Sequence, residues 1–555
     1  MLFRSLLSLT ALVAATPTEQ TPYGRSIIRF EGRPGPQQVK DPVQRQAMEQ
    51  ALADAGVDAR WIAVVDPSGN PYLYNPWLPC VEANPAENEA ILKEWVAEMH
   101  ARGTPVMTWF GMAICESAWQ VHPEWRQVSQ LPWGPEPHLG KLCCPMTGFG
   151  DALTNYLIDA IGRLGLDGVW FDGSVWTPIW TRPVPLTCFC DTCQQVYMEE
   201  TGHPLPVVLE WSNPEFRDWV EWRTRKFGEY IEQVAGRIRA AHPDCAVVIN
   251  HYHRPGIPWE SAVPIDKYQA DIITGSEAFE PPMADLVSRL TRAYGRPQSE
   301  VWHALDVRES PEATANVMLH HALTCYAAGT YPSFGGNPAD PRAAEAFSLM
   351  SPILKAIHPL VGGPSLPYAA LHVSQQSETF FFSRGGPLSE PPNFYWRALE
   401  NWDWSFLGAG LTPDYIFDAD FTQEKLSRYQ VLLMPLSPAL SAAEARVALD
   451  FARQGGTLVL GLGAGQADPE GEPARVNLLT EKLGFRYLSK LDPNALGPVA
   501  VQLQGLGDEV LNLNGVLCPL ALEATEWSPL YSNSVQGPVL ASRPYGDGKD
   551  RKSTR

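Results

Sequence analysis

Hydrophobic and polar positions follow two different patterns along the first two thirds of the chain. Short apolar runs, typical of buried strands, are followed by segments in which apolar residues recur every three or four positions, as on one face of a helix. The runs that predict strands are 25–32, 58–66, 105–111, 167–173, 245–253, 270–277, 299–306 and 330–336. Helical patterns occupy 41–56, 84–102, 151–164, 215–241, 282–294, 311–328 and 342–358. We interpret residues 20–360 as eight strand-and-helix units, although no helical pattern is assigned after the strand at 245–253, and this order predicts a (β/α)8 TIM barrel of the α/β class.

After residues 361–367 the pattern restarts on a smaller scale. Apolar runs at 368–374, 414–418, 429–436 and 457–463 predict strands, and the segments near 393–409 and at 441–454 predict helices. This order is typical of a parallel sheet covered by helices. We therefore expect a second, smaller α/β domain over residues 367–545.

Both ends of the chain carry signals of their own. The first 15 residues have one positive charge, at Arg4, and then an apolar run too short to span a bilayer, which predicts a cleaved signal peptide and a secreted or periplasmic protein. Near the other end, "PVLASRPYGDGKD" resembles the approach to a strand that the polar "RKSTR" cannot form. We expect that this C-terminus is truncated or frame-shifted, or that a β-sandwich domain is missing.

Composition narrows the classes of partner. The formal net charge of -20, from 42 Lys and Arg against 62 Asp and Glu, repels phosphate backbones and argues against a nucleic-acid partner. No later stretch reaches membrane-spanning length, so no membrane partner is expected. The 19 Trp and 18 Tyr suit stacking against sugar rings, although they suit ordinary cores equally well.

Three cysteines form a C-x-C-x-x-C motif, at Cys188, Cys190 and Cys193. Thiols this close are strained as mutual disulfides but well placed around a tetrahedral metal, which needs a fourth ligand. Cys144, or its neighbour Cys143, is the natural fourth donor. Four thiolates predict a structural zinc that cannot activate water, and disulfide pairing is the alternative in a secreted chain.

Asp172 ends the fourth predicted strand, in "LDGVWFDG". The carboxyl ends of barrel strands form the catalytic face, so Asp172 is a candidate catalytic carboxylate. The alternative is an Asx-turn, which the following Gly173 favours.

The segment from the Cys-Pro loop through the C-x-C-x-x-C motif to "QQVYMEETG" resembles the barrel of family 42 β-galactosidases, which hold zinc in this arrangement. The Asp in "GVWFDG" departs from that family, whose fourth strand ends in Asn-Glu, and resembles the nucleophile strand of α-L-fucosidases of families 29 and 151. Residues 429–466 are similar to the β-galactosidase trimerisation domain, a flavodoxin- or amidotransferase-like fold without the glutaminase cysteine. Taken over about residues 20–545, the resemblance is closest to the "hypothetical glycosyl hydrolase 6" type.

Such a resemblance implies glycosidase chemistry, which needs two carboxyl groups across the glycosidic bond. We expect Asp172 to be the nucleophile and Glu277, at the end of the sixth strand, to be the acid/base, although a helix-start role suits Glu277 nearly as well. Asp306 is the reserve candidate. The other predicted sugar contacts, all at or near strand ends, are Glu31, Trp109, Trp176, His251, His253 and His303.

The sequence therefore predicts a secreted, exo-acting, retaining glycoside hydrolase of the α-L-fucosidase type. Its partner would be an oligosaccharide or glycoside, and the chain would form a homo-oligomer, a trimer or dimer, through its second domain. A β-galactosidase-like activity is the alternative within the enzymes. An inactive sugar-binding barrel, without a second carboxylate near Asp172, is the alternative outside them.

Overall fold

The computed structural model describes residues 21–545 apart from 131–141, 173–185, 251–272, 279–280, 294–298, 305–306, 362–364, 383–392, 462, 489–496, 504–509, 516–519 and 534–536. The predicted signal peptide and the last ten residues thus lie outside the described part.

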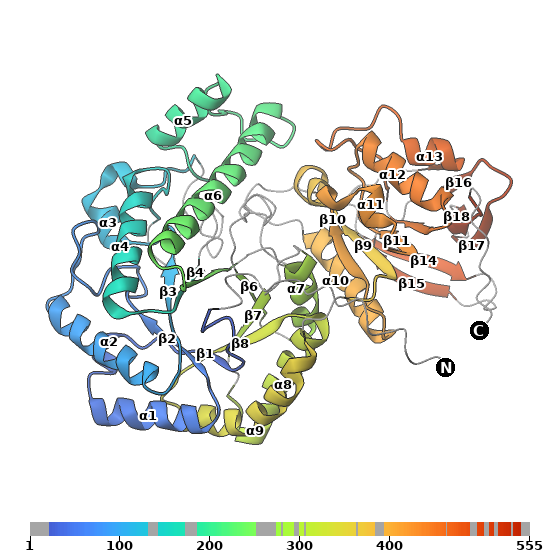
Figure 1. Cartoon of the computed structure of the whole chain (residues 1–555). Coiled ribbons are helices and arrows are strands. Elements are labelled where there is room, and N and C mark those ends of the chain that lie inside the picture. Colours follow the sequence, from blue (N-terminus) through green and yellow to red (C-terminus); the bar gives the residue numbers. More distant parts are fainter. Residues whose placement is uncertain are drawn as a thin grey trace.

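Eight parallel strands pair in chain order and close into a barrel, with β1 beside β8 (Figure 1), which confirms the predicted TIM barrel. The strands are β1 (Arg29–Glu31), β2 (Ala59–Ala63), β3 (Val106–Gly111), β4 (Gly168–Asp172), β5 (Ala246–Asn250), β6 (Ile273–Glu277), β7 (Ser299–Ala304) and β8 (Tyr331–Gly335).

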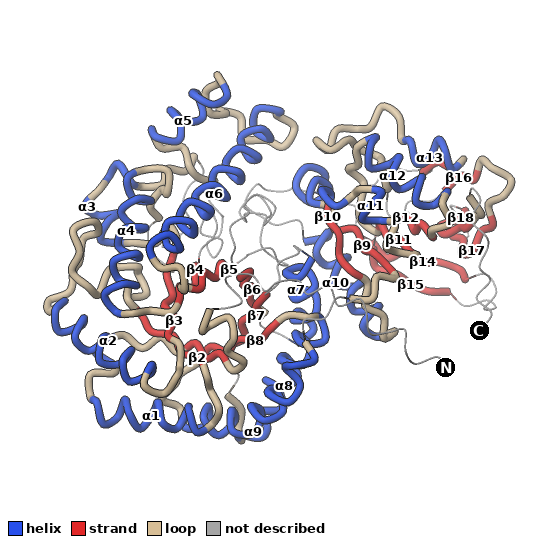
Figure 2. Tube along the Cα trace, in the orientation of Figure 1, coloured by secondary structure: helices blue, strands red, loops and turns tan. Residues whose placement is uncertain are grey.

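Helices surround the barrel on its outside, as the ring around the red strands in Figure 2 shows. They are α1 (Pro42–Asp54), α2 (Pro85–His100), α4 (Gly148–Leu164), α6 (Pro214–Ala241), α7 (Pro281–Ala293), α8 (Pro311–Ala328) and α9 (Pro341–Ile357). Two helices that the sequence pattern did not predict, α3 (Glu116–Val121) and α5 (Asp191–Thr201), lie in the loops after β3 and β4. Of the helices in the described part, none is both long and apolar enough to cross a membrane.

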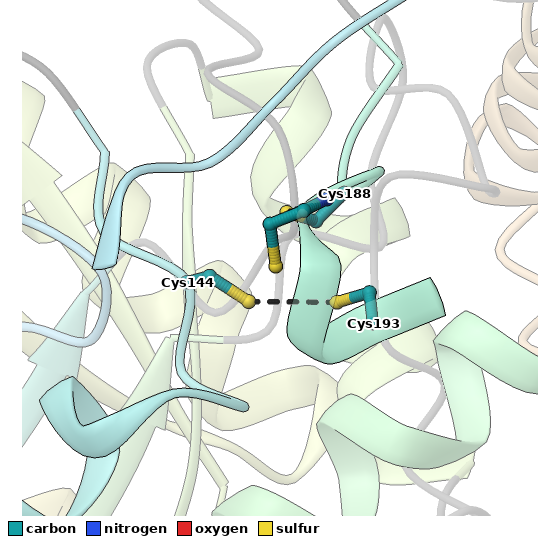
Figure 3. A group of neighbouring side chains, drawn as sticks. Cys144, Cys188 and Cys193 are labelled. Carbon is teal, nitrogen blue, oxygen red and sulfur yellow. Dashed lines mark hydrogen bonds between the residues drawn. The ribbon is translucent and has the colours of Figure 1, made fainter. Parts of the chain in front are cut away.

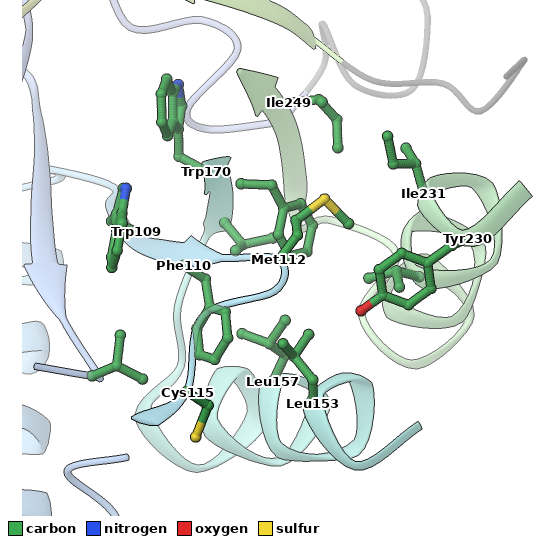
Figure 4. Packing of buried hydrophobic residues seen from close by; sticks show 14 of the residues in the cluster. Trp109, Phe110, Met112, Cys115, Leu153, Leu157, Trp170, Tyr230, Ile231 and Ile249 are labelled. Atoms are coloured by element: carbon green, nitrogen blue, oxygen red, sulfur yellow. The ribbon is translucent and has the colours of Figure 1, made fainter. Parts of the chain in front are cut away.

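Each barrel strand presents alternate side chains to the interior and to the helices, as the pleat of a strand requires. Figure 4 shows Trp109 and Trp170 on one side of the strands and Phe110 on the other, facing α4. The ring of Phe110 lies 5.9 Å from that of Tyr156 on α4, whereas Trp170 packs inside the barrel at 5.3 Å from Trp61. Asp172 lies two residues beyond Trp170 and therefore shares its inward face.

Contacts at the ends of α4 and at the start of β4 determine where β4 joins the sheet. The hydroxyl of Thr147 accepts a hydrogen bond from the Phe149 amide at the start of α4. Gly165 ends the helix with a φ of 71°, a left-handed conformation that glycine adopts without steric cost. Asp167 then accepts a hydrogen bond of 2.7 Å from the Val106 amide, which ties the start of β4 to β3. These contacts fix the start of β4 and thereby place Asp172 at the carboxyl end of the strand.

The second domain contains a four-stranded parallel sheet in the order β10-β9-β11-β12, as the sequence predicts for a small α/β domain. Its strands are β9 (Ala369–Val373), β10 (Asp414–Phe417), β11 (Val431–Met434) and β12 (Thr457–Leu460), and its helices are α10 (Asn393–Gly408), α11 (Gln423–Leu426), α12 (Ala442–Arg453) and α13 (Leu478–Leu483).

Two antiparallel sheets follow that the sequence analysis did not predict. They consist of β13 (Phe485–Tyr487) with β16 (Leu520–Leu522), and of β14 (Gly497–Leu503), β15 (Val510–Gly515), β17 (Ser528–Asn533) and β18 (Gly537–Ser542).

The two domains meet at α7, which packs against both α10 and β10. Leu286 and Leu290 of α7 belong to one buried cluster with Leu371 and Tyr415 of the second domain. Charged groups are buried beside this cluster: Arg289 pairs with Asp285 at 2.7 Å and lies 3.7 Å from Asp403 of α10, whose carboxylate also accepts a hydrogen bond from the Tyr415 hydroxyl. The junction therefore combines an apolar contact with two carboxyl groups that share one guanidinium.

Candidate active site

Asp172 is held by the strands on either side of it at the carboxyl end of the barrel. Its Oδ2 accepts a hydrogen bond from Nε1 of Trp109 on β3, and its Oδ1 accepts one from Nδ2 of Asn250 on β5, both at 3.0 Å. Each oxygen thus receives one N–H donor, and the two donors come from the strands on either side of β4. The side chain is partly exposed, so a substrate can reach it.

Trp109 was predicted as a sugar contact, but little of its surface is available for stacking. Its side chain is almost completely buried, and the guanidinium of Arg33 lies over the ring, 4.5 Å from its centre. Arg33 forms an ion pair of 2.6 Å with Glu31, the last residue of β1. One face of Trp109 is therefore occupied by Arg33, and its indole N–H is directed at Asp172.

Two residues of this group were not predicted as site residues. Asn250 was not among them, although the polar end of the apolar run 246–250 was an available signal. Its side chain is 1% exposed, and its Oδ1 has no hydrogen-bond partner among the described residues. Arg33 follows β1 by two residues in a Gly-Arg-Pro segment, and nothing in that local pattern distinguishes it from an ordinary loop arginine.

Glu277 is the last residue of β6, where the prediction placed it, and pairs with Trp302 of β7 in the strand register. Asn250 pairs with Gly275, so β6 extends two residues beyond the level of Asn250. β6 is two strands from β4, about 10 Å between backbones. The side chain of Glu277 lies outside the described part, and so do the predicted site residues Trp176, His251, His253 and Asp306.

His303 does not fit its predicted role as a sugar contact. Its imidazole is fully buried, with Nδ1 3.1 Å from the carbonyl oxygen of Ala278 and Nε2 3.2 Å from the Cys325 sulfur on α8. Burial lowers the pKa of His303 well below its ordinary value, and the nearby His321 adds to this effect. Glu300 of β7 faces the interior of the barrel, where it forms an ion pair with Arg29 of β1. Because side chains alternate along a strand, His303, three residues further on, faces the helices.

The predicted cysteine cluster is present in the loops after β3 and β4 (Figure 3). The sulfur atoms of Cys144, Cys188, Cys190 and Cys193 are buried and lie within 4.8 Å of one another. Cys144 and Cys193 are 3.6 Å apart, far beyond a disulfide bond but close to the roughly 3.8 Å between sulfurs of a tetrahedral zinc site. The donor set therefore fits a tetrahedral metal.

The geometry also decides between the two adjacent cysteines. The thiol of Cys143 donates a hydrogen bond to the carbonyl oxygen of Cys115 and does not join the cluster, whereas Cys144 does. Burial raises the pKa of the Cys144 thiol. Hydrogen bonds with the neighbouring thiols lower the pKa of Cys190, and the bond with Cys144 makes the largest contribution. All cysteines of the described part are free thiols, which does not favour the alternative of disulfide pairing.

Comparisons with known proteins agree with this architecture. The family model Glycosyl hydrolase-like 10 matches residues 28–256, which contain β1 to β5, Asp172 and the four clustered cysteines. Among curated proteins, none matches the chain.

Solved structures of glycosidases share the fold across both domains. A catalytic mutant of a GH42 β-galactosidase from G. stearothermophilus has a TM-score of 0.71 at 15% identity, covering 94% of this chain and 84% of that chain. The β-galactosidase from Bacillus circulans sp. alkalophilus has a TM-score of 0.70 at 12% identity, covering 96% and 86%. α-L-Fucosidase isoenzyme 2 from Paenibacillus thiaminolyticus has a TM-score of 0.64 at 16% identity, covering 88% and 70%.

The fold is that of a TIM barrel followed by a smaller α/β domain, and residues 28–256 of the barrel are similar to the Glycosyl hydrolase-like 10 family. At these identities, the likeness to solved structures is one of fold.

Proposed function

We propose that this protein is an exo-acting, retaining glycoside hydrolase of the α-L-fucosidase type, with Asp172 as nucleophile and Glu277 as acid/base. The observation that carries the proposal is the position of Asp172: a partly exposed carboxylate at the carboxyl end of a barrel strand, with an N–H donor on each oxygen. In that position an ionised carboxylate attacks C1 of the sugar, and a second carboxyl group protonates the leaving oxygen.

The charges of the described site favour an uncharged sugar. Glu31 and Arg33 form an ion pair and neutralise each other, so Asp172 gives this part of the site a net negative charge. A negative site stabilises the positive charge that develops on the sugar ring in the transition state and repels anionic substrates such as uronic acids.

A β-galactosidase-like activity is the second candidate, because the GH42 structures cover both domains of this chain. A panel of 4-nitrophenyl glycosides, including the α-L-fucoside and the β-D-galactoside, separates the two. Hydrolysis followed by proton NMR then gives the anomer released first: the retained anomer supports a nucleophile, whereas the inverted anomer contradicts it. Failure to cleave any member of the panel favours the inactive sugar-binding barrel.

The cysteine cluster is proposed to hold one structural zinc ion. The four thiolates would fill the tetrahedral shell and connect the loops after β3 and β4, on the same face of the barrel as Asp172. With no open coordination position, the ion would not take part in the reaction.

Secretion and assembly complete the proposal. A signal peptide over residues 1–15 would direct the chain out of the cytoplasm, which N-terminal sequencing of the mature protein tests. Homo-oligomerisation through the second domain is tested by the mass of the native particle in light scattering.

A further inference from the structure

The contacts around Trp109 connect β1 to the carboxylate of Asp172 through a continuous series of side chains. Glu31 holds Arg33 at 2.6 Å, Arg33 lies 4.5 Å from the centre of the Trp109 ring, and the indole N–H donates to Asp172 at 3.0 Å. We propose that Trp109 is a positioning residue, clamped by Arg33, that fixes the orientation of Asp172 for attack. This inference rests on the proposed function and deepens it.

Burial and geometry explain why Trp109 acts through Asp172 and does not bind sugar itself. Its side chain is 6% exposed, and its donor atom is engaged by the carboxylate. Asn250, with 1% of its surface exposed, holds the other oxygen, so two rigid donors fix the plane of the carboxylate. Holding a nucleophile at the attack angle lowers the entropy lost in the reaction, and small misplacements cost large factors in rate.

The role assigned to Arg33 depends on its shape as well as on its charge. A guanidinium is planar and covers an aromatic face, whereas an ammonium is a point charge that keeps its hydration. Lys at position 33 would preserve the ion pair with Glu31 but not the clamp on Trp109. The side chain of Arg33 is 36% exposed, so a direct contact with substrate is the competing role that the experiment must separate.

The test compares Trp109→Phe, Arg33→Lys and Arg33→Met with the wild type on the 4-nitrophenyl glycoside that the wild type cleaves best. Trp109→Phe keeps an aromatic ring at this position but removes the indole N–H that donates to Asp172, so the carboxylate loses one of the two donors that hold it. Its kcat should fall by about 10- to 100-fold with KM nearly unchanged. Arg33→Lys and Arg33→Met should behave alike, and in both the fall in kcat should be smaller than in Trp109→Phe.

Trp119→Phe is the matched control, because Arg126 stacks on the Trp119 ring at 3.9 Å outside the Asp172 group. This variant should keep the wild-type kcat and KM, and circular dichroism should show the native fold in all four variants. An unchanged kcat in Trp109→Phe would overturn the proposal. A raised KM with unchanged kcat in both Arg33 variants would do so too, since it would assign Arg33 to substrate binding. Near-normal activity of Asp172→Asn would instead contradict the proposed function.

Discussion

At the scale of single residues, the direction of the side chain at each strand end decides which groups face the interior of the barrel. Asp172 and Glu277 were both expected because they end strands, and both do. Trp109 and His303 were chosen by the same rule, yet one is covered by Arg33 and the other faces α8. A position at the end of a strand places a residue at the rim of the barrel. Whether its side chain faces the interior or the helices depends on the alternation of side chains along the strand.

The acid/base assignment predicts a dependence on the leaving group. Glu277→Ala should reduce kcat/KM by about 10²- to 10⁴-fold for substrates with poor leaving groups, because only these need a proton in the first step. Aryl glycosides with very acidic phenols should react almost normally. A series of aryl glycosides of graded phenol pKa measures this dependence. The same pattern in Asp306→Ala, and not in Glu277→Ala, would transfer the role to Asp306.

At the scale of elements, the barrel could be predicted from the sequence because its strands are short apolar runs that alternate with helical patterns. The antiparallel strands β13 to β18 were missed because no helical pattern separates them, although β14 and β15 do show alternating positions. The cysteine spacing, by contrast, correctly located the cluster in the loops after β3 and β4. It could not choose between Cys143 and Cys144, because that choice depends on which thiol the loop after β3 turns inward.

The cluster gives the second prediction. Purified protein should contain about one equivalent of zinc, and Cys144→Ser should lose it together with several degrees of melting temperature, because metal binding is coupled to folding. Cys143→Ser is the matched control, since its thiol contacts the Cys115 carbonyl and not the cluster, and it should retain the metal. Metal analysis and thermal unfolding measure both. Mass spectrometry that finds the cluster cysteines in disulfides would refute the assignment.

At the scale of the whole molecule, the contact between the domains should respond to pH. Burial raises the pKa of Asp403 to about 7, with the charge of Asp285 adding to the effect and Tyr415 and Arg289 opposing it. A carboxyl group whose pKa is higher in the folded than in the unfolded chain binds its proton more tightly when folded. Its stabilising contribution is present in full below about pH 4 and is lost as the pH rises through about 7.

Asp403→Asn carries a permanently neutral side chain of the same shape and should remove this dependence. We expect its free energy of unfolding to match the wild type at low pH and to exceed it at pH 8, where wild-type Asp403 is ionised. Urea unfolding at a series of pH values measures the difference, with Asp54→Asn, exposed on α1, as the control. A variant that is less stable than the wild type at pH 8 would show that ionised Asp403 is satisfied by Arg289 and Tyr415.

The most direct measurement on the proposed mechanism is the turnover of Asp172→Asn with and without azide. The substitution preserves shape and removes the attacking charge, so kcat should fall by about 10³-fold or more while the fold is unchanged. Azide should then restore part of the rate and yield a glycosyl azide of inverted anomeric configuration, because a small anion can take the place of the lost carboxylate. Near-normal turnover by Asp172→Asn on every glycoside that the wild type cleaves would contradict its role as nucleophile.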